Sequence, residues 1–285
     1  MARKPKGISS HAVMAQRHEA IDSLDFFPTP PWASRALFED VFFERQPLYV
    51  PPEDRVWQMR PWMGGKIVHR GPGPIAGISS WEPAAGEGHM AEVQKEYFGS
   101  VHASDVHDYG KGYSIGSFVG QGADIASPPS PADFIVTNPP FNLAVEFAHR
   151  AIAEAKIGVA LLLRTVWVEG KERYEELFLP RPPDIIAQFS ERVAMTKGEW
   201  NPEASTATAY AWFIWITDEA YRGLPATPGF SPTMWIPYGA KLRYTKPDDR
   251  ARFAKPKPPT IIEPIGVDVT RELLWAPEGA LGALL

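Results

Sequence analysis

Four residues near the middle of the chain, Asn138-Pro139-Pro140-Phe141, form the motif best suited to chemistry. An amino group on an aromatic ring is a poor nucleophile because its lone pair is delocalised into the ring. Two acceptors aimed at its N–H bonds would localise that pair, and the Asn138 side-chain oxygen and the Pro139 carbonyl can supply them. The two prolines restrict φ and keep the loop stiff, while Phe141 offers a face on which an extruded base can stack. The motif indicates chemistry on a planar NH2 group, with an inert proline-rich turn as the alternative.

A turn rich in small residues lies upstream, at residues 82–88 (EPAAGEG). Small residues let the backbone turn tightly and approach a ligand, and a following helix would offer free N–H groups. The turn departs from the dinucleotide pattern G-x-G-x-x-G, and the chain has no Walker lysine, so hydride transfer and phosphoryl transfer lose support. A tight turn without a ligand is the alternative.

Two acidic residues follow this turn at regular spacing. Asp105 lies about 20 residues past Gly86, at the end of the next expected strand, where a carboxylate suits the two hydroxyls of a ribose. Asp124 lies a similar distance further on and could meet the adenine amino group of a cofactor. Acids that cap loops are the alternative for both positions.

The elements expected to position these residues alternate along the chain. Strands are expected at 79–83, 100–106, 133–137, 157–163, 184–189 and 208–216, with a further one near 122–125. Helices are expected over 88–98, 142–156 and 170–179, and from Thr29, which would be the N-cap with Pro30 at the first helical position. Alternating strands and helices favour a mostly parallel α/β sheet covered on both faces.

Length and composition limit the alternatives. A chain of 285 residues with 44% hydrophobic content can form one α/β domain with extensions, or two small domains. No apolar run approaches ~20 residues, and the N-terminus lacks an apolar signal region, so neither a membrane span nor a signal peptide is expected. The absence of cysteine removes disulfides and cysteine nucleophiles and fits a cytoplasmic protein. The seven histidines show no metal-binding spacing, so no metal is expected.

The net charge of −5 argues mildly against a nucleic-acid partner, but the basic residues are unevenly distributed. Basic residues gather at the two ends of the chain, at Arg3, Lys4, Lys6, Lys241, Arg243, Lys246, Arg250, Arg252, Lys255 and Lys257. An acidic body with basic ends could hold DNA, and solvated tails are the alternative.

The motifs together resemble the adenine-N6 DNA methyltransferases of bacteria and their phages, over about residues 26–216. Phe27-Pro28-Thr29-Pro30 is similar to the N-terminal motif of that family. The resemblance implies a Rossmann-like class I fold dependent on S-adenosylmethionine, with a mostly parallel seven-stranded sheet and helices on both faces.

The resemblance also implies roles for single residues. Thr29 would contact the cofactor carboxylate and Glu82 its amino group, while Asp105 would bind the ribose. Asp124 would bind the cofactor adenine, and three small residues of the turn would line the site. These three are Ala84, Gly86 and Gly88.

The chain departs from this family in lacking an obvious recognition domain. The expected organisation is a flexible arm (1–25), a methyltransferase domain (26–216) with an irregular insertion (45–78), and an extension (217–285). The insertion, the loop 191–207 or the extension would have to contact DNA. Within that loop, Arg192 and Trp200 are candidates to pack on a flipped base, and Trp200 could equally be a packing residue.

The expected reaction is direct methyl transfer to the N6 amino group of adenine in DNA, without metal or covalent intermediate. A cytosine-C5 enzyme is excluded because it would need a cysteine nucleophile. One alternative keeps the chemistry but changes the acceptor, to adenine or guanine amino groups in RNA or to a glutamine side chain in a protein. Another is a nucleic-acid-binding phage protein that keeps the fold without activity.

Overall fold

The computed structural model describes residues 26–43, 75–120, 125–219 and 227–255. The expected arm, Asp124, Lys257 and nearly all of the expected insertion lie outside these residues. The chain divides into two units, residues 1–255 and 256–285, and all described residues belong to the first. Within the described ranges, no helix has the length and apolar composition needed to cross a bilayer.

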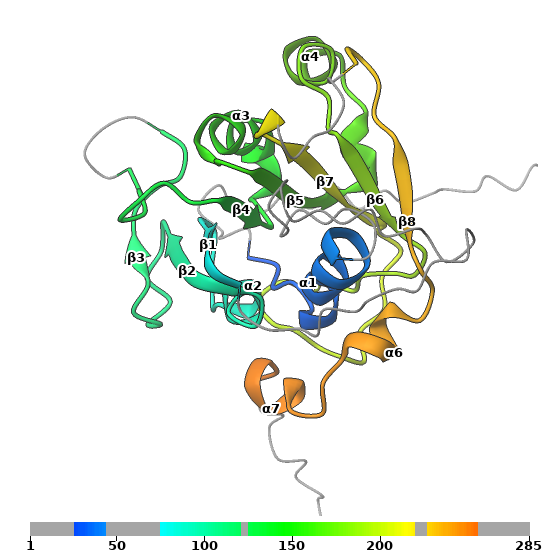
Figure 1. Cartoon of the computed structure of the whole chain (residues 1–285). Coiled ribbons are helices and arrows are strands. Elements are labelled where there is room, and N and C mark those ends of the chain that lie inside the picture. Colours follow the sequence, from blue (N-terminus) through cyan, green and yellow to red (C-terminus); the bar gives the residue numbers. More distant parts are fainter. Residues whose placement is uncertain (1–25, 44–74, 121–124, 220–226, 256–285) are drawn as a thin grey trace, which may run out of the picture. The chain divides into compact units, whose positions relative to one another are not determined.

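The centre of the molecule is an eight-stranded sheet in the order β3-β2-β1-β4-β5-β7-β6-β8 (Figure 1). Its strands are β1 (Ile75–Glu82), β2 (Phe98–Asp105), β3 (Ser114–Ile115), β4 (Phe134–Thr137), β5 (Gly158–Arg164), β6 (Ile185–Phe189), β7 (Tyr210–Ile216) and β8 (Thr233–Ile236). Only β7 runs antiparallel to its neighbours among these strands. The expected Rossmann-like α/β fold with a mostly parallel sheet is confirmed.

Three strands differ from the expectation. The sheet has eight strands rather than seven, because β8 pairs in parallel with β6 from within the expected extension. Its four residues lie between Pro232 and Pro237, and so short an edge strand carries no readable alternation. The third strand is at 114–115 rather than near 122–125, where Ile125 makes only an isolated bridge to Ser117. In addition, β1 begins at Ile75, inside the range expected to be irregular.

The helices are short and several continue into other helical forms. They are α1 (Pro31–Ala36) with a π-helical turn (Leu37–Phe43), α2 (His89–Gln94), a 3₁₀ turn (Phe141–Leu143) before α3 (Ala144–Glu154), a 3₁₀ turn (Thr165–Val168), α4 (Lys171–Arg173) with a π-helical turn (Tyr174–Phe178), α6 (Ala240–Tyr244) and α7 (Asp249–Phe253).

The start of α1 corrects the expectation for Thr29. The N-cap is Pro30, with ψ of 132°, and Pro31 is the first helical residue. A residue before a proline is pushed out of the helical region, so Pro30 cannot itself be helical when Pro31 follows. Thr29 is therefore free of the capping role and lies buried, with 3% of its surface exposed.

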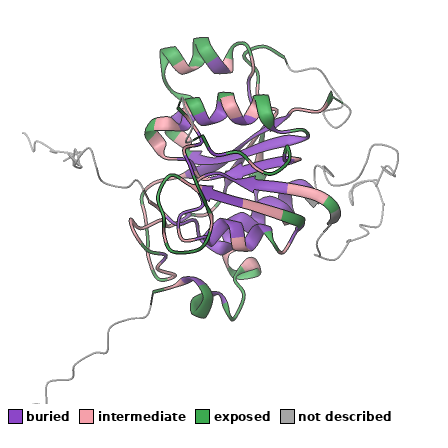
Figure 2. Ribbon diagram, turned by 90° about the vertical axis from the view of Figure 1, so that its left-hand side faces the viewer, coloured by how far each residue is buried: buried purple, intermediate pink, exposed green. Residues whose placement is uncertain are grey.

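The two large clusters of the core lie on opposite faces of the sheet, and a third, small cluster consists of Ala85, Ala91 and Ala103. Alternating side chains of β7 supply both large clusters, with Trp212 in the cluster that contains Trp32 of α1 and Phe213 in the cluster that contains Phe147 of α3. The central strands are accordingly buried along most of their length (Figure 2). Because apolar layers cover both faces, polar groups of these strands can meet a ligand only at the strand ends.

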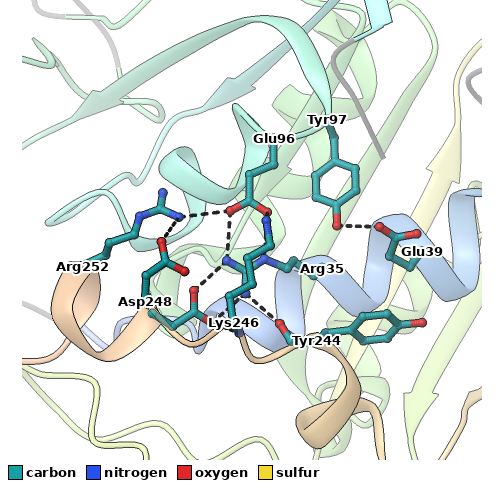
Figure 3. A network of polar contacts seen from close by, with 9 residues as sticks. Arg35, Glu39, Glu96, Tyr97, Tyr244, Lys246, Asp248 and Arg252 are labelled. Carbon is teal, nitrogen blue, oxygen red and sulfur yellow. Dashed lines mark hydrogen bonds and ion pairs between the residues drawn. The ribbon is translucent and has the colours of Figure 1, made fainter. Parts of the chain in front are cut away.

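A network of ion pairs around the buried Arg35 connects the C-terminal helices to the N-terminal helix α1 (Figure 3). The Arg35 guanidinium of α1 donates to both oxygens of Glu96, at 2.8 and 2.9 Å, and to both oxygens of Asp249, at 2.7 Å each. Burial opposes ionisation of Glu96, but hydrogen bonds from Arg35 and Lys246 outweigh it and lower the Glu96 pKa to about 2. Removing one partner of such a pair typically costs about 3–5 kcal/mol.

Candidate active site

Three expected site residues meet where neighbouring strands end. Glu82 is the last residue of β1, Asp105 is the last of β2, and Asn138 directly follows β4. β1 pairs in parallel with both other strands, so their carboxyl ends lie at one edge of the sheet. In open α/β sheets this edge is where ligands bind.

A cavity of about 350 Å³ opens at this edge. Six of the expected site residues line it, namely Thr29, Glu82, Ala84, Asp105, Asn138 and Pro140. Gly86, Gly88, Pro139 and Phe141 are not among its lining residues, and Asp124 lies outside the described part of the chain. Phe27 and Pro28 of the N-terminal motif line the cavity as well, so the structure brings together this motif, the ends of β1 and β2, and the loop after β4.

Asn138 presents an unsatisfied oxygen. Its Nδ2 donates to the Phe27 carbonyl at 2.9 Å and lies 3.6 Å from the Met195 sulfur. Because the amide nitrogen is committed to a carbonyl, the orientation of Oδ1 is determined as well. Oδ1 is buried and has no hydrogen-bond partner among the described residues. A buried acceptor without a donor costs about 1–3 kcal/mol, a cost that a ligand N–H would remove.

Phe141, the last residue of this loop, is not among the residues that line the cavity. Its ring centroid is 5.7 Å from that of Phe27 and 6.3 Å from that of Tyr210. The guanidinium carbon of Arg164 lies over the ring, 4.2 Å from its centroid. The face on which a base was expected to stack thus has a cation against it.

The two glycines of the turn shape the site without lining it. Gly86 has a φ of +53° and donates its N–H to Asp105 Oδ2 at 2.8 Å, and a Cβ there would overlap the Phe26 ring. Gly88 is the N-cap of α2 with a φ of +90°, and a Cβ there would overlap the Tyr113 hydroxyl. Both positions need left-handed backbone and close packing, which only glycine combines.

Glu82 is a buried carboxyl with no cation at ion-pair distance among the described residues. It is 1% exposed, and Oε1 accepts hydrogen bonds from Thr137 Oγ1 at 2.5 Å and from the Ala84 N–H at 3.1 Å. Burial outweighs these bonds and raises the pKa of Glu82 to about 8. A carboxyl in this state suits a ligand that carries its own positive charge.

Asp105 has both oxygens committed to the backbone. Oδ2 accepts the Gly86 N–H and Oδ1 accepts the His107 N–H at 2.9 Å. Burial raises the Asp105 pKa, and these two bonds oppose the rise. Carboxylate oxygens have further lone pairs, so Asp105 can still accept hydroxyl groups from the cavity.

His89 is a site residue that the sequence did not reveal. It is 5% exposed and lines the cavity from the first residue of α2. Its Nε2 lies 2.9 Å from the Phe253 carbonyl, which fixes Nε2 as the protonated nitrogen, and Nδ1 is buried without a partner among the described residues. The available signal was its position directly after Gly88, where the turn enters a helix.

The two residues expected to pack on a flipped base differ in their exposure to solvent. Trp200 is 4% exposed and packs against Phe253, so it is a core residue, whereas Arg192 is exposed. The described basic residues of the stretch 241–257 all contact a carboxylate or a carbonyl: Lys241 with Pro202, Arg243 with Asp40, Lys246 and Arg252 with Glu96, Arg250 with Glu203, and Lys255 with Gly198 and Glu87. This stretch consequently offers less free positive charge than its composition indicates.

No group of three or more potential metal ligands occurs in the described ranges. The lining of the cavity offers two acids, amide groups, a histidine and aromatic rings.

No family model matches the sequence, and no curated protein matches it. Similar solved structures include a putative class I S-adenosylmethionine-dependent methyltransferase from Listeria monocytogenes, with 12% identity, 58% of this chain and 61% of that chain covered, and a TM-score of 0.37. A type I restriction-modification methyltransferase subunit from Streptococcus thermophilus has 9% identity, 66% and 44% coverage, and a TM-score of 0.40. A modification subunit of a putative type I restriction enzyme from Vibrio vulnificus has 14% identity, 80% and 51% coverage, and a TM-score of 0.38. The matched part of this chain thus spans between 44% and 61% of those three chains.

Proposed function

We propose that this chain is an S-adenosylmethionine-dependent methyltransferase that acts on the N6 amino group of adenine in DNA. The observation that carries the proposal is that Asn138, whose Oδ1 is a buried acceptor without a donor among the described residues, lines the same cavity as the buried Glu82 carboxyl. The first group suits a planar amine and the second suits an ammonium ion.

The lining of the cavity fits the cofactor. Its volume of about 350 Å³ lies within the range of small-molecule sites. Glu82 would hold the ammonium group of the methionine part, Thr29 would contact its carboxylate, and Asp105 would accept the ribose hydroxyls. Bound there, the cofactor supplies a methyl group on a sulfonium sulfur.

The loop after β4 would prepare the acceptor nitrogen. Asn138 Oδ1 and the Pro139 carbonyl would each accept one N–H of the amine, which localises the nitrogen lone pair toward the methyl carbon. The cofactor, held by Glu82, Thr29 and Asp105, would supply the methyl group to this nitrogen and leave as a neutral thioether. The two oxygens stabilise the positive charge that develops on the amine, which afterwards loses one proton to water.

The hydrogen bond from Asn138 to Phe27 explains how the acceptor is held in position. The Phe27 carbonyl fixes the side-chain amide before any ligand arrives, so no reorganisation is needed during the reaction. Phe27 precedes Thr29 in the same segment, so one stretch of chain would contact the cofactor and orient the catalytic amide.

The experiment is methyl transfer from labelled cofactor into DNA, RNA and protein, run side by side, with modified-base sequencing of the DNA. We expect label in DNA as N6-methyladenine. Asn138→Ala should abolish transfer while cofactor binding survives, and the control Glu154→Ala, at the exposed last residue of α3, should transfer normally. Label in protein or RNA alone, or near-normal turnover of Asn138→Ala, would overturn the proposal.

A further inference from the structure

A second cavity, of about 500 Å³, is lined by none of the residues of the first and includes Phe141 of the loop after β4. Phe141 forms one wall, and the remaining wall residues come from β5 and the segment after it, including Arg164, Trp167, Glu169 and Arg173. The loop Asn138–Phe141 thus contributes residues to both cavities, one suited to the cofactor and one without an assigned ligand.

Arg164 is placed by the register of the sheet. Thr137, the last residue of β4, pairs with Leu161, so β5 continues for three residues past the end of β4 and terminates at Arg164. This extension carries the Arg164 side chain to the level of the catalytic loop, where it covers the Phe141 ring at 4.2 Å.

No described carboxylate forms an ion pair with Arg164. Its side chain is exposed and makes no hydrogen bond or ion pair with any residue of the described ranges. Arg173 donates to the Trp167 and Glu169 carbonyls and forms no ion pair with a described carboxylate. Glu169 is the one acid in the lining of this cavity, against two arginines. By contrast, most cations of residues 241–255 are paired with acids.

An aromatic wall next to two arginines that form no ion pair with a described carboxylate favours an acceptor that is both planar and anionic. A guanidinium on the Phe141 ring occupies the place in which a base would stack, so it must leave when a base enters. Once displaced, a flexible arginine reaches outward, and its planar fork matches phosphate oxygens well. A glutamine side chain of a protein would offer neither an aromatic ring nor a phosphate.

We propose that the second cavity receives the acceptor nucleotide, and that Arg164 moves from the Phe141 ring to a backbone phosphate next to the bound base. This inference rests on the proposed function and deepens it, because it makes a polynucleotide rather than a protein the acceptor. Arg164 then acts as a positioning residue that exchanges a contact within the protein for one with the substrate.

The test compares Arg164→Gln, Arg164→Lys and the control Lys171→Gln in methyl transfer to unmethylated genomic DNA between about 50 and 200 mM salt. Lys171 is an exposed cation of α4 outside the cavity lining, so its variant loses the same charge elsewhere. For Arg164→Gln we expect a roughly tenfold higher KM at low salt and a smaller change in kcat. The salt slope, which is the slope of log(1/KM) against the logarithm of the salt concentration, should become less steep by about 0.9 for duplex DNA. Arg164→Lys should keep the slope, and Lys171→Gln should keep both slope and KM.

The outcomes separate this inference from the proposed function. If the wild type methylates DNA but Arg164→Gln keeps the full salt slope, this inference is wrong and the proposed function stands. Faster turnover of Arg164→Gln with an unchanged slope would likewise overturn it, since Arg164 would then merely shield the ring. If the wild type labels protein and not nucleic acid, both fail. Unchanged cofactor affinity of each variant shows that the first cavity is intact.

Discussion

If Glu82 binds the ammonium group of the cofactor, cofactor affinity must change with pH. Burial raises the pKa of this carboxyl to about 8 in the free protein, so at neutral pH most molecules carry it protonated. Pairing with an ammonium ion requires the carboxylate, so each binding event must release the proton. Higher pH removes this cost and strengthens binding until the carboxyl is ionised in the free protein as well.

The size of the effect follows from the pKa. With a free-protein pKa of about 8 and a bound-state pKa well below 6, affinity should rise about 25-fold between about pH 6 and 7.5. At pH 7 about 0.9 proton should be released per cofactor bound, and the carboxylate form should cost about 1.4 kcal/mol to reach.

Titration calorimetry in two buffers with different ionisation enthalpies measures both quantities. The matched variant is Glu82→Gln, which keeps a side chain of the same shape but has no carboxyl to titrate. The amino group of the ligand also titrates, near pH 8, and contributes equally to both proteins, so the difference between them isolates Glu82. Equal pH dependence and equal proton release in the two proteins would refute the assignment of Glu82.

Two further predictions concern stability. Asp249→Asn should lower the free energy of unfolding by about 3–5 kcal/mol and the midpoint of thermal unfolding by roughly 10 °C, because the substitution leaves the buried Arg35 charge without one of its two partners. The control Asp248→Asn, at an exposed neighbouring residue, should change the free energy of unfolding by less than about 1 kcal/mol. Denaturant unfolding measures this, and a loss equal to that of the control would mean that the pair contributes nothing. Gly88→Ala should lower the free energy of unfolding by more than the ~1–2 kcal/mol that a left-handed alanine costs, because the new Cβ would overlap Tyr113. The control Gly198→Ala, with a φ of +80° and open space around its Cβ position, should show this backbone cost alone. Adding Tyr113→Phe should recover part of the difference, and no recovery would contradict the proposed overlap.

Much of the candidate site follows from local sequence. The apolar run before Asn138 and the positions of Glu82 and Asp105 at strand ends indicate polar residues at one edge of a parallel sheet, and the structure places them around one cavity. Such inferences succeed because the alternation of side chains along a strand depends on neighbours within a few residues, and because ligands of open α/β sheets bind at the carboxyl ends of the strands. The capping role expected for Thr29 was wrong at the same local level, because Pro31 keeps Pro30 out of the helical region and makes Pro30 the N-cap.

Contacts between distant segments were decided only by the tertiary structure. The basic stretch at 241–257 indicates a surface for DNA by composition, yet Arg252 and Lys246 pair with Glu96, and Asp249 from the same stretch pairs with Arg35, more than 200 positions away. The sequence likewise could not show that the Phe253 carbonyl orients His89, or that Arg164 would cover Phe141. Composition records which charges and rings a chain carries, but their partners are set by packing, because an ion pair or a stacked ring needs atoms within a few ångströms whatever their separation along the chain.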